Sequence, residues 1–78
     1  MIEERRKATR TAIALMTRYG GGAAQEHATA ELERAARRGD DAGYLFWRYV
    51  VEDIADLRIV EAAKGYALGR ALRWHERP

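Results

Sequence analysis

The chain has 78 residues, no cysteine, 33% charged residues and a formal net charge of +2. A chain of this length forms one small domain, in which a single hydrophobic core is only marginally sufficient. The lack of cysteine excludes disulfides and thiolate-ligated zinc or iron–sulfur sites. The two signs of charge are interleaved, so the concentrated positive surface of a dedicated nucleic-acid-binding protein is absent.

The first predicted helix runs from about Ile2 to Tyr19. Its apolar residues recur at three- and four-residue steps, the period of a helix with one buried face. The expected inward positions are Ile2, Ala8, Thr9, Ala12, Ile13, Leu15, Met16 and Tyr19. Gly20-Gly21-Gly22 then predicts a turn, because three consecutive glycines lose too much backbone entropy to remain helical.

A second helix is predicted from about Ala23 to Arg38, a stretch rich in strong helix formers. Small residues dominate its inward face, so a neighbouring helix can approach closely while burying little area. The inward positions are Ala24, Ala28, Leu32, Ala35 and Ala36. Gly39 suits a left-handed helix end, and Asp40 or Asp41 can accept hydrogen bonds from the first free N–H groups of the next helix.

The third predicted helix begins at Asp40 or Asp41 and meets no strong stop before Pro78. A clear apolar stripe extends as far as Leu57, and apolar residues continue at helical spacing beyond it. The stripe consists of Trp47, Val50, Val51, Ile54 and Leu57, followed by Ile59, Val60, Ala63, Tyr66, Ala67, Leu68, Ala71 and Leu72. Gly65 and Gly69 weaken the second half, so the pattern leaves open whether the helix is continuous through Gly65.

These elements predict an all-α protein in which two short antiparallel helices pack on a longer C-terminal helix. Residues 1–57 would form the compact core, and residues 58–78 a helical extension within the same domain. No stretch shows the sustained two-residue alternation of a strand. The residues expected to anchor the fold are Gly39, Asp40, Trp47, Val50, Ile54 and Leu57.

The run from Ala8 to Leu57 resembles a group of small uncharacterised alphaproteobacterial helical proteins, known as domains of unknown function. The resemblance rests on a helix ending in a glycine turn, an Ala/Glu/Arg helix, a Gly-Asp turn and a helix with a tryptophan. The matching residues are Tyr19-Gly20, the helix from Ala24 to Arg38, Gly39-Asp40, Gly43, Trp47, Val50, Ile54 and Leu57. The resemblance implies a fold and brings no catalytic residues.

No constellation of residues predicts catalysis, a cofactor or a metal. His27 and Glu31 share one helix face, but a metal site needs further ligands and no second cluster has matching spacing. The third helix carries four acidic residues but no Glu-x-x-His motif of the kind found in di-metal bundles. We interpret them as a solvated face whose negative charges balance those of Arg48, Arg58 and Lys64. These residues are Glu52, Asp53, Asp56 and Glu61.

Two basic clusters provide the alternative hypothesis, weak nucleic-acid binding through phosphate contacts. The N-terminal cluster is Arg5, Arg6, Lys7 and Arg10, and the C-terminal cluster is Lys64, Arg70, Arg73 and Arg77. Glutamates dilute both clusters, and no helix-turn-helix spacing or aromatic-plus-basic platform accompanies them. We therefore rank nucleic-acid binding below protein binding.

Protein–protein association is the leading functional hypothesis. Four aromatic residues at positions 44, 46, 47 and 49 cannot all face one core, because successive helical residues lie about 100° apart. The extension adds apolar residues beyond the reach of the first two helices. The predicted partner-binding residues are Tyr44, Phe46, Tyr66, Leu68, Leu72 and Trp74.

The sequence thus predicts a non-catalytic accessory or regulatory module that dimerises or docks onto another protein through its C-terminal helix. We expect it in the cytoplasm, since Met1-Ile2 leads directly into charged residues rather than a signal peptide. No apolar run approaches the ~20 residues of a membrane-spanning helix, so no membrane insertion is expected.

Overall fold

The computed structural model describes the backbone of residues 2–75 and the side chains of residues 2–65. Within this part of the chain there are three helices and no strand, which confirms the all-α prediction. The helices are α1 (Ile2–Tyr19), α2 (Gly21–Arg38) and α3 (Asp41–His75). Helix α3 has 35 residues and continues through Gly65 without a break.

The predicted three-glycine turn is wrong in extent, because only Gly20 lies outside the helices. Gly20 has φ 82° and ψ 164°, a backbone conformation that favours glycine. Gly21 and Gly22 form the first turn of α2. A Cβ atom on Gly21 would lie 3.0 Å from Cγ of Arg58 on α3, so glycine at this position lets the start of α2 lie close against that side chain.

The second turn joins α2 to α3 through Gly39 and Asp40. Gly39 adopts the left-handed conformation with φ 69°, and its N–H donates to the carbonyl of Ala36 at 3.2 Å. The N–H of Asp40 donates to the carbonyl of Ala35 at 2.9 Å, which satisfies a second free carbonyl of the helix end. Asp40 then caps α3, because its Oδ1 accepts the N–H of Gly43 at 3.0 Å.

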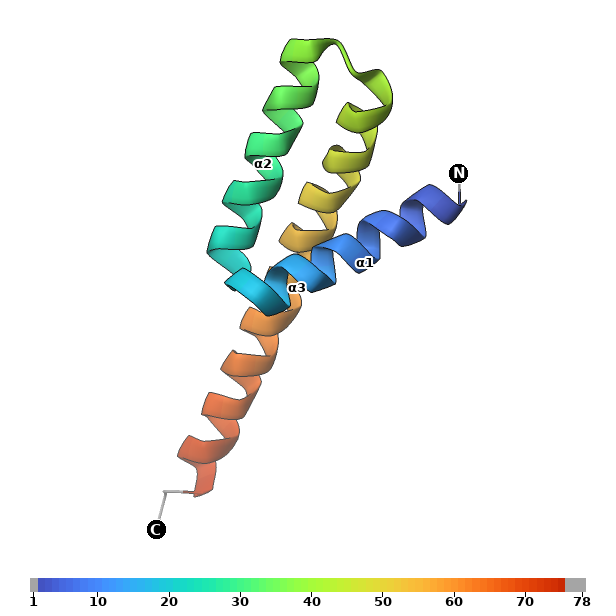
Figure 1. The fold of residues 1–78 in the computed structure, drawn as a ribbon. Helices are drawn as coiled ribbons and strands as arrows, with labels where there is room; N and C mark the ends of the chain where they lie inside the picture. Colours follow the sequence, from blue (N-terminus) through green and yellow to red (C-terminus); the bar gives the residue numbers. More distant parts are fainter. Residues whose placement is uncertain (1, 76–78) are drawn as a thin grey trace.

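Figure 1 shows α2 lying antiparallel alongside the N-terminal half of α3, while α1 crosses the middle of α3 obliquely. All three pairs of helices are in contact. The C-terminal half of α3 leads away from α1 and α2, so the last turn of α3 lies far from the start of α1 (Figure 1). The three helices therefore share one core around the first half of α3.

Alanines on α1 and α2 enclose two β-branched residues of α3. Ala8, Ala12, Ala24 and Ala28 are fully buried together with Val50 and Ile54, and the larger side chains around them are partly buried. This partly buried shell contains Leu15, Met16, Phe46, Trp47, Tyr49, Val51 and Leu57. Small side chains on two helices allow close packing around a core of little volume.

The buried face of α1 differs from the predicted one. Ile2, Ile13 and Tyr19 were expected to point inward, but their side chains are 71%, 50% and 45% exposed. Ala8 and Ala12 are the buried residues of this helix. Helix α1 crosses α3 obliquely (Figure 1), and the side chains that it buries fully are small, whereas three of its large apolar side chains stay exposed.

The molecule is elongated, with extents of 61 × 24 × 16 Å. Its radius of gyration is 16.3 Å, whereas a compact domain of 78 residues has about 11.5 Å. Its accessible surface is 6139 Å², whereas a compact monomer of 8.9 kDa has about 4,800 Å². The chain therefore exposes about 1,300 Å² more surface than a compact protein of its mass.

Candidate functional site

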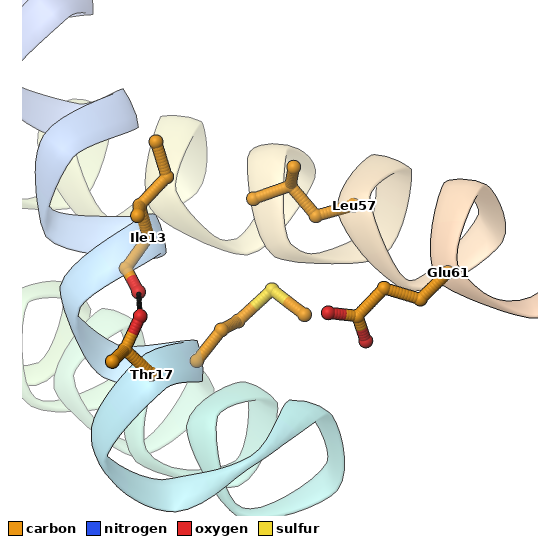
Figure 2. Close-up of a pocket in the computed structure, with 5 residues that line it drawn as sticks. Ile13, Thr17, Leu57 and Glu61 are labelled. Atoms are coloured by element: carbon orange, nitrogen blue, oxygen red, sulfur yellow. Dashed lines mark hydrogen bonds between the residues drawn. The ribbon is translucent and has the colours of Figure 1, made fainter. Parts of the chain in front are cut away.

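A hollow lies between the C-terminal half of α1 and the point where α3 leaves the core. We call it the α1–α3 hollow; it is lined by Ile13, Met16, Thr17, Leu57 and Glu61. In Figure 2, Leu57 and Glu61 extend from α3 and Ile13 and Thr17 from α1. The Thr17 hydroxyl donates to the carbonyl of Ile13 at 2.8 Å, so that hydroxyl is already occupied.

The size and chemistry of the α1–α3 hollow limit what it can bind. Its volume is about 160 Å³, well below the roughly 300–1,000 Å³ of small-molecule sites. Ile13, Met16 and Leu57 make most of the lining apolar, while Glu61 adds a carboxylate that points from α3 toward α1 (Figure 2). Such a hollow suits one apolar side chain of a protein partner, with a basic group beside it.

Both helices that form the hollow carry exposed apolar residues. Ile13 is 50% exposed on α1, and Val60 is 47% exposed on α3. Val60 follows Leu57 by three residues and so lies on the same side of the helix. Ile59 is 67% exposed but follows Leu57 by two residues, which places it on the far side of α3.

A second cluster of functional groups ties the N-terminal half of α1 to α3. Arg5 Nη2 donates to Asp53 Oδ1 at 2.9 Å, and Thr9 Oγ1 donates to Asp53 Oδ2 at 2.8 Å. The guanidinium of Arg5 also lies 4.6 Å from the centre of the Tyr49 ring, a cation–π contact. Glu52 adds a longer ion pair of 3.9 Å to Arg5 Nη1.

This polar cluster corrects the interpretation of Asp53 as part of a solvated acidic face. Asp53 is only 9% exposed, and both of its carboxylate oxygens are hydrogen-bonded to α1. Its neighbours on α3 behave differently: Glu52 pairs with Arg48 at 3.4 Å, and Asp56 and Glu61 are exposed. The sequence did contain a signal for this contact. Arg5 and Thr9 are one turn apart on α1, and Asp53 follows the buried Val50 by three residues, so it lies near the buried side of α3.

The same cluster weakens the N-terminal basic cluster as a phosphate-binding surface. The charge of Arg5 is compensated by Asp53 and Glu52. Arg6, Lys7 and Arg10 remain exposed on α1. Lys64 is exposed on α3, and the other members of the C-terminal basic cluster lie outside the residues whose side chains are described.

Aromatic rings cover the end of the core where α1 meets α2. The His27 ring stacks on Tyr19 at a centroid distance of 5.8 Å and meets the edge of Trp47 at 6.1 Å. Phe46 packs against Trp47 at 5.2 Å. Glu31 pairs with Arg34 rather than with His27. Among the described residues, no group of three His, Cys, Asp or Glu side chains could hold a metal ion.

The structure separates the predicted partner-binding residues. Tyr44 is 41% exposed, as is the neighbouring Leu45, near the start of α3. Phe46 is partly buried and packs on the core, which leaves less of its side chain to a partner than expected. Tyr66, Leu68, Leu72 and Trp74 belong to α3, but their side chains lie outside the described residues. The α1–α3 hollow itself was not foreseen, because it forms between two helices distant in sequence.

No described helix is long and apolar enough to cross a membrane. No protein-family model, curated protein or solved structure matches the chain.

Proposed function

We propose that this protein is a non-catalytic helical module that associates with protein through the C-terminal half of α3. The carrying observation is the shape of the fold: α3 continues beyond α1 and α2, and the chain exposes about 1,300 Å² more surface than a compact protein of its mass. Helices with unpartnered apolar residues normally find a covering surface. The α1–α3 hollow and Val60 lie where such a partner would meet the core.

The predicted antiparallel pairing of the two short helices is not seen, because α1 crosses α2 and α3 obliquely (Figure 1). In this proposal α1 and α2 together hold the first half of α3. Residues 1–57 are the supporting core and residues 58–78 the docking segment. Of the predicted partner-binding residues, Leu68, Leu72 and Trp74 meet the partner, with Tyr44 as a second contact. Position 66, a tyrosine, follows Ile59 by seven residues and belongs to the far side of α3, so it takes no part in this docking surface. Membership of the alphaproteobacterial group and a cytoplasmic location are parts of the same proposal.

Crosslinking in the cells that naturally make the protein tests this function. We expect crosslinked species for the wild type, and their loss in Val60→Glu, which places a charge beside the α1–α3 hollow. Ile59→Glu is the matched control, because it makes the same kind of change one residue away on the far side of the helix. Equal crosslinking of all three proteins, or none of any, would contradict the proposed docking surface.

Weak nucleic-acid binding is the competing function, and Arg5's engagement with Asp53 disfavours it. It predicts affinity for duplex DNA or RNA that falls steeply between ~50 and ~200 mM salt. Protein docking through apolar contacts predicts association that tolerates the same change. Measuring the nucleic-acid affinity and the protein association of the purified full chain at both salt concentrations separates the two functions.

A further inference from the structure

The buried face of α3 continues past the core as a regular seam. Its positions alternate in steps of four and three residues, the spacing of a helix that packs against another along one line. They are Val50, Ile54, Leu57, Glu61, Lys64 and Leu68. Because α3 is one continuous helix to His75, its register keeps these positions on one side. The first two are fully buried by α1 and α2, whereas Glu61 and Lys64 are exposed.

The middle of this seam carries one negative and one positive side chain, and a partner helix must offer the complementary charges. Glu61 and Lys64 lie one turn apart, and neither forms an ion pair with another described residue. If a second α3 ran antiparallel, with a two-fold axis between Ala62 and Ala63, Glu61 of each copy would face Lys64 of the other. A charged pair at seam positions sets register and orientation in paired helices.

The same register brings a leucine position to the α1–α3 hollow. With the axis between Ala62 and Ala63, position 68 of the second copy, a leucine in the sequence, comes opposite position 57. The hollow beside Leu57 has a volume of about 160 Å³ and a mostly apolar lining, which suits one branched apolar side chain. Two-fold symmetry repeats every contact, so one complementary set serves both copies.

The exposed area is sufficient for such a pair. A stable interface buries about 800 Å² per partner, and this chain exposes about 1,300 Å² beyond a compact protein of its mass. We propose that the covering partner is a second copy of this chain, with the two α3 helices antiparallel and Glu61 paired with Lys64 across the two-fold axis. This inference rests on the proposed docking function and names its partner.

A charge-swap experiment on the full chain tests the proposal. Glu61→Lys places two lysines opposite each other in the dimer, and Lys64→Glu places two glutamates there. Sedimentation velocity at low salt should show a wild-type dimer and a dissociation constant at least about tenfold higher for each variant, since facing like charges are strongly disfavoured. An equimolar mixture of the two variants should restore association, because each lysine-bearing seam then meets a glutamate-bearing one. A pair within one helix cannot be restored by mixing.

The controls keep the test specific. Ile59→Glu should associate like the wild type, and far-UV circular dichroism should show equal helix content in every variant. The proposal is overturned if the wild type stays monomeric at about 100 μM, a concentration at which even weak specific complexes form. It is equally overturned if the mixture behaves like its separate components, or if Ile59→Glu dissociates as Glu61→Lys does.

The in-cell crosslinks separate this proposal from the docking function. Crosslinked species of twice the chain mass support both. Species of another mass overturn the second-copy proposal and leave docking through α3 intact. A monomer in solution with no crosslinked species contradicts both.

Discussion

The two halves of α3 belong to one continuous helix, but their surroundings are opposite. In the first half, Val50 and Ile54 are fully buried between α1 and α2. In the second half, Ile59 and Val60 are 67% and 47% exposed. The comparison teaches that the periodicity of apolar residues in α3 predicts which face of that helix is buried. It does not tell whether the same chain supplies the covering surface.

The number of available partners explains this difference. Each of α1 and α2 has 18 residues, whereas α3 has 35, so neither helix can follow α3 along its whole length. At ~1.5 Å per residue, α3 extends over about 52 Å and the others over about 27 Å. The oblique crossing of α1 reduces its coverage further.

The largest effect on the free energy of unfolding is expected when a valine is replaced by alanine in the first half of α3, and the same substitution in the second half is its comparison. Val50→Ala should lower the free energy of unfolding by roughly 2 kcal/mol, because it removes fully buried apolar area and leaves a cavity. Val60→Ala should change it by no more than about 0.5 kcal/mol in the monomer. Urea unfolding at low micromolar concentration measures both. Equal losses would show that the second half of α3 is covered within one chain.

The next effect concerns the polar tie between α1 and the first half of α3. Asp53→Ala should cost about 1.5 kcal/mol, because it leaves the guanidinium of Arg5 and the hydroxyl of Thr9 without their charged acceptor. Glu52→Ala is the matched control, since it removes a neighbouring exposed carboxylate with only long ion pairs, and should cost less than about 0.5 kcal/mol. Similar losses for the two variants would contradict a specific role for Asp53.

Sequence reasoning predicted the helices better than their contacts, and Asp53 shows why. Helix ends depend on local chemistry: Tyr19 ends α1 before Gly20, and Gly39 ends α2 before the Asp40 cap. The burial of Asp53 depends on which face of α1 meets α3, and that follows from the crossing angle. An acidic residue beside apolar neighbours has the same pattern whether it faces water or an arginine 48 positions away.

The α1–α3 hollow was beyond prediction for the same reason. Ile13 was expected in the core, but the oblique crossing leaves it half exposed at the edge of the hollow. Gly21 gives a smaller example, because the close approach of Arg58 outweighs the entropic cost of a helical glycine. Both differences arise from packing between elements rather than from local sequence.

A smaller effect is expected at the turn that starts the covered half of α3. Asp40→Ala should cost about 1 kcal/mol, because the N–H of Gly43 loses its side-chain acceptor at the helix N-terminus. Asp40→Asn should retain most of the stability, since asparagine caps helices about as well. Thermal unfolding followed by circular dichroism measures both variants. A loss as large for Asn as for Ala would show that the charge, rather than the cap, matters.

The smallest effect on stability is expected from a substitution in the uncovered second half of α3, at Gly65. Gly65→Ala should stabilise α3 by up to about 1 kcal/mol, because alanine loses less backbone entropy in a helix and a Cβ atom at this position would lie in open space among the residues whose side chains are described. The gain should appear as higher helix content by circular dichroism, with little change in the urea midpoint of the core. Alanine at Gly22, also helical with open space at its Cβ position, is the control on α2. If Gly65→Ala raised the core midpoint as much as Gly22→Ala does, the two halves of α3 would unfold as one unit, and the uncovered half would be part of the cooperative fold rather than an extension of it.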